Sequence, residues 1–129
     1  MAQPGSVVLD VPANATIQVT GITNSGGWKE QIEVGPAGGS PPAVWTSTGA
    51  QSNKVVGQLT IPKSAAPSQI TVAMSYDSGS ALQPSTIQSA PFSFQGLAGF
   101  VVGGQDGGGR PNGPAFWNTV VFIYYAVGY

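Results

Sequence analysis

Residues 100–129 read FVVGGQDGGGRPNGPAFWNTVVFIYYAVGY, and this segment decides the fold. A short apolar run, Phe100–Val102, enters a loop built almost wholly from Gly, Pro, Asn, Gln, Asp and Arg. The chain leaves this loop through Phe116 into its most apolar stretch, Trp117–Val127. As an extended strand, that stretch is apolar on both faces, which indicates a strand at the centre of a sandwich or one covered by another subunit. We favour a subunit contact.

The composition predicts a turn-rich all-β domain. The 129 residues are 41% hydrophobic and only 7% charged, and they include 19 glycines and 11 prolines. Disordered chains have few apolar residues and much charge, so this composition argues against disorder. Many Gly and Pro turns between short apolar runs are typical of sandwiches and barrels. The length suits one domain with its own core.

The ionisable residues exclude several classes of function. Only four Lys and Arg residues are present and the formal net charge is −1, too little positive charge to neutralise nucleic-acid phosphates. The sequence lacks histidine and cysteine, which excludes a Ser-His-Asp triad, disulfides and a zinc site of the usual kind. It also lacks a secretory signal peptide and an apolar run of membrane-spanning length. We therefore expect no membrane insertion and a soluble protein, either cytoplasmic or exported by another route.

Alternation of apolar and polar residues predicts about nine short strands in an antiparallel β-sandwich, as one domain over residues 1–129. No segment shows the apolar spacing of a helix. The segments 15–22 and 28–34 are expected to pair as a hairpin around the turn at 23–27. Pro91 places the strand at 86–94 at an edge or a bulge. The predicted strands are 6–11, 15–22, 28–34, 43–47, 54–61, 69–76, 86–94, 97–102 and 117–127.

The carboxylates do not form a recognisable catalytic motif. Asp10, Glu30 and Glu33 lie on predicted strands where a solvated face is expected, and Asp77 lies in an Asp-Ser-Gly turn where aspartate caps the local backbone. The glycine-rich loop that contains Asp106 is not followed by a helix, so it lacks the helix N-terminus of a phosphate loop. We expect no enzyme. A glycoside hydrolase would need two of these carboxylates to face each other across a cleft.

The loop at 103–116 admits two interpretations. Its glycines allow a ligand to approach the backbone closely, while Asp106, Arg110 and Asn112 offer polar contacts and Trp117 offers an aromatic face for a sugar ring. Alternatively, the loop is an ordinary surface connection, and Trp117 closes one end of the core. The residues alone leave this choice open.

Both ends of the sequence resemble one protein family, the calcium-dependent fucose- and mannose-binding lectins of Gram-negative bacteria. Residues 7–27, VVLDVPANATIQVTGITNSGG, resemble their N-terminal part, which has a Leu-Pro-Ala-Asn turn and an Asn-Ser-Ser/Gly loop that touches the sugar. Asn24 and Ser25 stand in that loop, although by themselves they indicate only a turn. FVVGGQDG followed by FWNTVVFIYYAVGY looks like the family's ending, in which an Asp/Asn-rich loop holds paired calcium ions. Trp117 and Asn118 then match the family's aromatic residue and its ligating Asn.

Most of the calcium ligands that the resemblance implies are missing. The family's loop carries a Glu and several Asp, whereas Asp106 is the only acid here and Thr119 stands where a bridging Asp would be. Calcium takes roughly six to eight oxygen ligands. Asn24, Asp106 and Asn118 remain weak candidate ligands, and Arg110 adds a positive charge where the ions would lie. We expect at most one weak calcium site and little or no calcium dependence.

The residues and the resemblance together imply a non-catalytic carbohydrate-binding protein of the lectin type. A monosaccharide or glycan would bind between the 23–27 loop and the 103–116 loop, and the C-terminal strand would join two or more copies in a homo-oligomer. The alternative is a structural or assembly protein that keeps the lectin fold while its sugar site has decayed. The predicted sugar contacts are Asn24, Ser25, Asp106, Arg110, Asn112, Trp117 and Asn118.

Overall fold

Ten β-strands make up the part of the chain that the computed structural model describes, residues 5–24, 26–36, 42–79, 81–106 and 117–127. Within these ranges there is no helix with the length and hydropathy needed to cross a bilayer. The strands are β1 (Ser6–Val11), β2 (Ile17–Thr23), β3 (Gly26–Pro36), β4 (Ala43–Ala50), β5 (Lys54–Ile61), β6 (Ser68–Asp77), β7 (Leu82–Pro84), β8 (Thr86–Phe94), β9 (Leu97–Gln105) and β10 (Thr119–Ala126).

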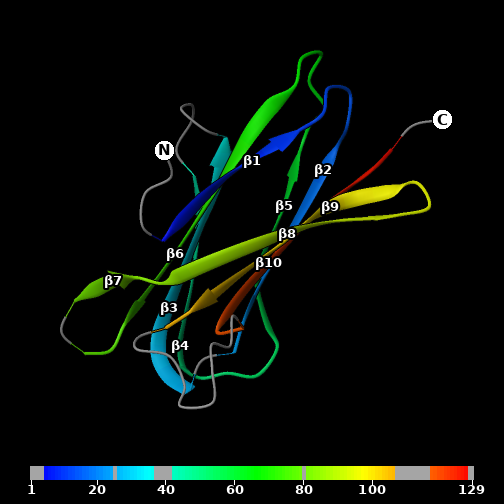
Figure 1. Cartoon of the computed structure of the whole chain (residues 1–129). Coiled ribbons are helices and arrows are strands. Elements are labelled where there is room, and N and C mark those ends of the chain that lie inside the picture. Colours follow the sequence, from blue (N-terminus) through cyan, green and yellow to red (C-terminus); the bar gives the residue numbers. More distant parts are fainter. Residues whose placement is uncertain (1–4, 25, 37–41, 80, 107–116, 128–129) are drawn as a thin grey trace.

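The strands form two antiparallel sheets (Figure 1). Sheet A has the order β1-β6-β3-β4, with the short β7 paired to β6, and sheet B has the order β5-β2-β10-β9-β8. Buried side chains from both sheets share one core. Across that core, the Thr119 hydroxyl of sheet B donates to Sδ of Met74 in sheet A at 3.1 Å. The predicted antiparallel β-sandwich is therefore confirmed.

The predicted strands are found close to their expected positions. β5 and β8 begin and end at the residues that the alternation predicts. The one strand that the prediction lacks is β7, which has only three residues, all exposed. Three residues are too few to show an alternating pattern, so β7 leaves no signal in the sequence.

β2 and β3 do not form the predicted hairpin. β2 pairs with β5 and β10 in sheet B, whereas β3 pairs with β4 and β6 in sheet A. The chain crosses from one sheet to the other between these strands, and Val19 and Ile32 face the same core from opposite sides. Alternation tells which face of a strand is buried, but it does not tell which strand is the neighbour. For this reason a sequence-adjacent pairing was the wrong expectation.

The core sits between the inner faces of the two sheets. The regular strands β2 and β6 contribute every second residue, as the pleat of an extended chain requires. On β2, for example, Ile17 and Val19 are buried, while Gln18 and Thr20 between them are partly exposed. The fully enclosed apolar side chains are Ile17, Val19, Ile32, Val34, Ile70, Val72, Met74, Val102, Val121 and Ile123.

Trp45 of β4 packs across the open side of the sandwich, between β4 and β5. Its indole lies against the backbones of Gly21 and Gly57, which face each other on β2 and β5. A Cβ at Gly21 would stand 2.6 Å from Cε3 of Trp45, and a Cβ at Gly57 would stand still closer to the ring. The two glycines therefore leave the space that this indole fills.

β8 is an edge strand of sheet B, as Pro91 predicts. Proline has no N–H to donate, and an edge strand needs donors on one side only. A tight turn joins β8 to β9, with Gln95 at φ 39° and Gly96 at φ 91°. Two consecutive residues of positive φ are typical of the turn that matches the twist of a hairpin.

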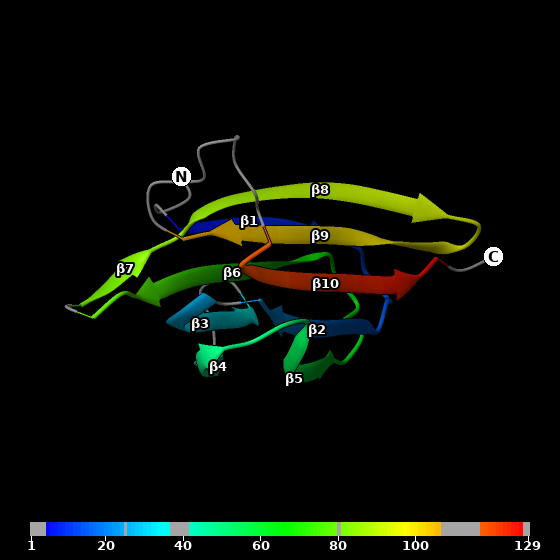
Figure 2. The ribbon, with the colours of Figure 1, turned by 90° about the horizontal axis from the view of Figure 1, so that it is seen from below.

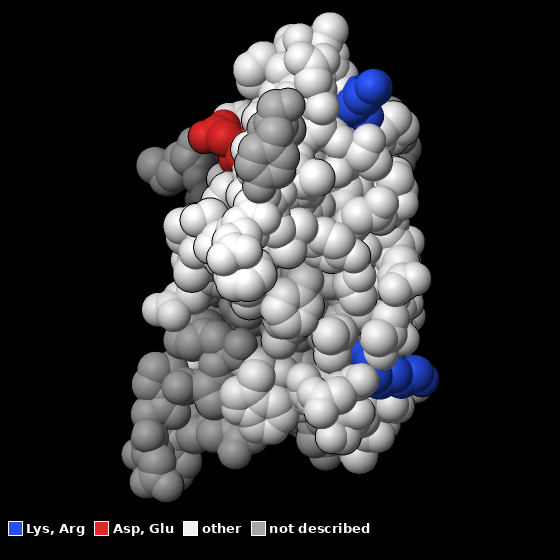
Figure 3. Space-filling model, turned by 90° about the vertical axis from the view of Figure 1, so that its right-hand side faces the viewer, with Lys and Arg blue, Asp and Glu red and all other residues white. Residues whose placement is uncertain are grey.

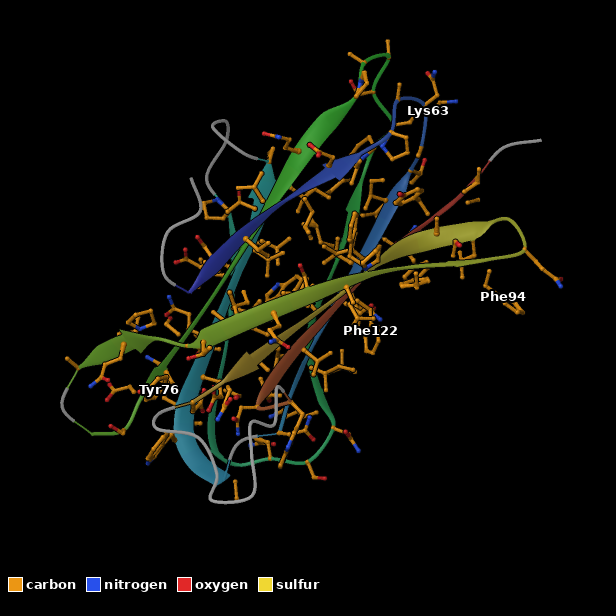
Figure 4. All side chains as sticks on the ribbon, viewed as in Figure 1. Lys63, Tyr76, Phe94 and Phe122 are labelled. Carbon is orange, nitrogen blue, oxygen red and sulfur yellow. The ribbon has the colours of Figure 1, made fainter. Side chains whose placement is uncertain are left out.

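β10 is the central strand of sheet B, between β2 and β9 (Figure 2). Its side chains alternate between the core and an exposed outer face, from which Phe122 projects (Figure 4). The core accounts for the apolar inner face only, and the predicted subunit contact through the outer face stays a prediction. The register groups a set of outward side chains that we name the apolar outer face: Phe92, Phe94, Leu97, Val101, Val120, Phe122 and Tyr124.

The outer face of sheet A has a different character. Its outward side chains are mostly polar, and some bond to one another: Gln69 Nε2 donates to Asp10 Oδ1 at 3.0 Å, and Gln31 Nε2 donates to Glu33 Oε1 at 3.2 Å. Charge is sparse elsewhere. The side of the molecule seen in Figure 3 carries charged groups only near its margins, with uncharged surface between them.

Candidate functional site

Asn24 ties together three segments at one end of the sandwich. Its backbone N–H donates to the Asn118 carbonyl at 2.8 Å, and its side-chain Nδ2 donates to the Trp117 carbonyl at 3.0 Å. Its Oδ1 accepts from the backbone N–H of Asn53 at 2.6 Å, in the turn between β4 and β5. The 23–27 segment is thus joined directly to the residues that follow the 103–116 loop. Both ends of the Asn24 amide are used in this clamp, so Asn24 is better suited to positioning its neighbours than to holding a ligand.

Asp106 and Asn118 are also brought together. The backbone N–H of Asp106 donates to Asn118 Oδ1 at 3.0 Å, and the backbone N–H of Asn118 donates to the Gly104 carbonyl at 3.1 Å. The Ser85 hydroxyl lies 3.4 Å from Asp106 Oδ1. Because Asn118 uses its oxygen to accept, its NH₂ group is left to donate. The site therefore offers a carboxyl group and an amide donor side by side.

Glu30 is the residue of this region that the sequence analysis misses. It was expected on a solvated face, but its exposed fraction is 0%. The correction has a simple geometric reason: Glu30 shares the parity of Ile32 and Val34, and that face of β3 turns to the core. Its side chain interacts with Asp106, and this interaction is one of the causes that act on the Asp106 pKa. The sequence signal that could have revealed this burial is the two-residue spacing that Glu30 shares with the apolar Ile32 and Val34.

The contact between Glu30 and Asp106 links the two sheets. Glu30 belongs to sheet A, whereas Asp106 follows β9 of sheet B.

Burial raises the pKa of Asp106 above its usual value of 3.8, and the hydrogen bonds with Glu30 and Ser85 offset part of that rise. A raised pKa means that the folded protein holds this proton more tightly than the unfolded chain does. The resulting stabilisation is fully present below the unfolded pKa and is lost as the pH rises through the folded pKa. Asp106 therefore favours the folded state more at acidic pH than at neutral pH.

We expect Asp106→Asn to change how the melting temperature depends on pH. The melting temperature of the variant minus that of the wild type should increase between about pH 4 and about pH 7, because only the wild type must ionise a buried carboxyl group. Thermal melts followed by circular dichroism measure this difference. Asp10→Asn, an exposed carboxylate on sheet A, is the matched control. A difference that stays flat or decreases with pH would contradict the expectation.

The described residues do not fit a pair of calcium ions. No group of three or more acidic, His or Cys side chains that could hold a metal occurs among them. Asn24 Oδ1 and Asn118 Oδ1 each accept from a backbone N–H. Thr119, at the position of the family's bridging Asp, is fully buried and directs its hydroxyl to Met74. These oxygens are already used by the fold, so the donor set falls well short of what calcium needs.

The remaining predicted site residues divide into two groups. Trp117 lies directly beside Asn118, and 40% of its surface is exposed, so its ring is accessible to a ligand. Both interpretations of the 103–116 loop stay predictions. Ser25, Arg110 and Asn112 lie outside the described residues, and their predicted contacts stay predictions.

No family model matches this sequence, and no curated protein matches it. Three solved structures share its fold over nearly the whole chain. The Chromobacterium violaceum lectin CV2L in complex with α-methyl-fucoside has 22% identity and a TM-score of 0.66, covering 98% of this chain and 100% of its own. The C-terminal domain of the BC2L-C lectin from Burkholderia cenocepacia has 18% identity and a TM-score of 0.69, covering 99% and 100%. The high-affinity mannose-binding lectin of Ralstonia solanacearum has 21% identity and a TM-score of 0.68, covering 98% and 100%. The fold that the resemblance implies is therefore confirmed.

Proposed function

We propose that this chain is a non-catalytic carbohydrate-binding protein whose site lies between the 23–27 loop and the 103–116 loop. The observation that carries the proposal is the hydrogen-bonded junction in which Asn24 bonds to the Trp117 and Asn118 carbonyls and the Asn118 side chain bonds to the Asp106 backbone. An aromatic face beside a carboxyl group and an amide donor suits a pyranose ring, which has an apolar face and a rim of hydroxyls. The shared fold with a lectin bound to α-methyl-fucoside and with a mannose-binding lectin supports this assignment.

Each residue has a distinct role in the proposal. Trp117 stacks on the sugar, because the negative face of an indole attracts the C–H groups of the ring. Asp106 accepts from sugar hydroxyls, and the Asn118 NH₂ group donates to them. Asn24 holds the backbone of Trp117 and Asn118 in position through its hydrogen bonds to their carbonyls. Ser25, Arg110 and Asn112 remain in the proposed set on the strength of the sequence pattern alone.

We propose that sugar binding has little or no calcium dependence. The described donor set supports this, because the oxygens that could ligate are engaged in hydrogen bonds within the fold. In place of cations, the Glu30–Asp106 contact ties the base of the loop to the opposite sheet.

Calorimetric titration with methyl α-fucoside and methyl α-mannoside, with EDTA and with added calcium, tests the proposal. We expect binding of one of these sugars to persist in EDTA. Asp106→Ala should weaken binding about tenfold or more, because a hydrogen bond to a charged or acidic group contributes roughly 1.5–3 kcal/mol. Asp10→Ala, which removes an exposed carboxylate on sheet A, should leave the affinity unchanged.

Trp117→Ala provides a second test if Asp106→Ala fails to fold, and it should also abolish most of the binding. Absence of binding to any sugar of a glycan array, with and without calcium, would overturn the proposed function. Binding that disappears in EDTA would overturn only its calcium independence.

We further propose that the apolar outer face of sheet B joins copies of the chain in a homo-oligomer. Phe122 and Tyr124 are each 37% exposed at the centre of this face. Large contiguous apolar patches on a sheet are more typical of subunit contacts than of solvated surface. The same face favours the second candidate function, an assembly protein with a decayed sugar site. Oligomers that form normally but bind no glycan would decide for that candidate.

A further inference from the structure

Trp28 forms an exposed aromatic platform that the proposed sugar site does not use. The residue lies near the start of β3, and 43% of its surface is exposed. Its ring stacks on that of Tyr76 with the centroids 5.4 Å apart and the planes 16° from parallel. Tyr76 is itself only 7% exposed, so the lower ring of the stack is held in the core. The orientation of Trp28 is therefore fixed by packing.

A polar group accompanies this platform. The Tyr76 hydroxyl donates to Gln83 Oε1 on β7 at 3.1 Å, which anchors the outer end of the tyrosine. Gln83 is exposed, and because its oxygen accepts this bond, its NH₂ group is left to donate. A rigid aromatic face with an amide donor at its margin is the same combination that Trp117 and Asn118 provide.

The platform lies at the same end of the sandwich as the proposed site. Figure 4 shows Tyr76 at the opposite end from Lys63, which follows β5. Tyr76 is the cross-strand partner of Glu30, and the Glu30 side chain interacts with Asp106. Trp28 precedes Glu30 by two residues, which is about 7 Å along a strand. Trp28 and Asp106 are thus linked by a short chain of contacts across the open end of the two sheets.

We propose that Trp28, Tyr76 and Gln83 form a second sugar subsite, which binds the next residue of a glycan whose terminal sugar lies at Trp117 and Asp106. This inference rests on the proposed function and adds to it that the ligand is an oligosaccharide. Trp28 stacks on the apolar face of the second ring, and the Gln83 amide donates to one of its hydroxyls. Because Tyr76 fixes the indole before the ligand arrives, little side-chain entropy is lost on binding.

The test compares short and long ligands. Methyl α-fucoside and methyl α-mannoside are titrated calorimetrically beside disaccharides that end in the same sugar. We expect at least one disaccharide to bind the wild type about tenfold more tightly than its monosaccharide. Trp28→Ala should remove this gain and leave the affinity for the monosaccharide unchanged. Trp28→Tyr, which keeps an aromatic face, should restore part of the gain.

Phe94→Ala is the matched control, because Phe94 is also an exposed aromatic residue but lies at the opposite end of the sandwich (Figure 4). It should preserve the disaccharide gain. The subsite is wrong if no disaccharide binds better than its monosaccharide, or if Trp28→Ala keeps the gain. It is also wrong if Trp28→Ala weakens both ligands equally, since Trp28 would then support the first site. Failure of the wild type to bind any sugar would instead reject the proposed function itself.

Discussion

Gly57→Ala is expected to lower the free energy of unfolding by about 3 kcal/mol and the melting temperature by roughly 10 °C. The methyl group would enter the space occupied by the Trp45 indole, because the ring lies directly against the Gly57 backbone. The strand pairing of β5 with β2 fixes that backbone, so the indole is the group that must move. Displacing it exposes a large apolar surface and leaves a void between β4 and β5. Thermal and chemical denaturation measure the loss.

A double-mutant cycle identifies the cause of this loss. Trp45→Ala alone should cost about as much as Gly57→Ala, because each removes the same packing. The combined variant Trp45→Ala with Gly57→Ala should then be no less stable than Trp45→Ala, since the methyl group has nothing left to displace. Gln58→Ala is the control on the same strand, because Gln58 is exposed and faces away from the core. If the losses of unfolding free energy from the two substitutions add fully in the double variant, the clash with Trp45 is not the reason why Gly57→Ala destabilises the fold.

Phe122→Asp is expected to convert the proposed oligomer to monomers. It would place a charge at the centre of the apolar outer face, where a partner's apolar surface would have to remove it from water. The side chain projects away from the core, so the monomer should remain folded. Light scattering coupled to size-exclusion chromatography measures the mass, and circular dichroism checks the fold.

Val8→Asp supplies the matched control for this second prediction. Val8 is 41% exposed, much like Phe122 at 37%, but it lies on β1 of sheet A. The same chemical change on that sheet should leave the mass of the oligomer unaltered. A wild type that is monomeric at all concentrations would reject the proposed contact. If the Phe122→Asp variant keeps the mass of the oligomer, the subunit contact lies on another surface.

The fold was predictable from local patterns where each strand buries one face. Alternating residues such as Ile70, Val72 and Met74 located β6, and Pro91 assigned β8 to an edge. Pairing was not predictable in the same way. The hairpin expected from β2 and β3 was wrong because the turn sequence at 23–27 is equally compatible with a crossing between sheets. Burial is a local property of the sequence, whereas strand order depends on distant segments.

The candidate site was predictable in part. Asn24, Asp106, Trp117 and Asn118 were expected to meet, and hydrogen bonds bring their segments together. The buried Glu30 was missed because a carboxylate on a strand is usually solvated, and only its partner across the core makes burial tolerable. The role of Asn24 also differs from the expectation. Its side-chain amide forms hydrogen bonds with the backbones of Asn53 and Trp117. A sequence pattern cannot show that a side chain already has hydrogen-bond partners within the fold.

The position of β10 has a consequence for how the chain acquires its structure during synthesis. β10 follows the other nine described strands in the sequence, yet it lies at the centre of sheet B between β2 and β9. Asn24 and Trp117, which bond across this junction, are 93 residues apart. Until β10 emerges from the ribosome, β2 and β9 each present an open edge, and open edges recruit strands from other chains. Long-range pairings of this kind also form slowly. The nascent chain therefore depends on β10 to cover these edges, and we expect it to need protection by chaperones until β10 has emerged.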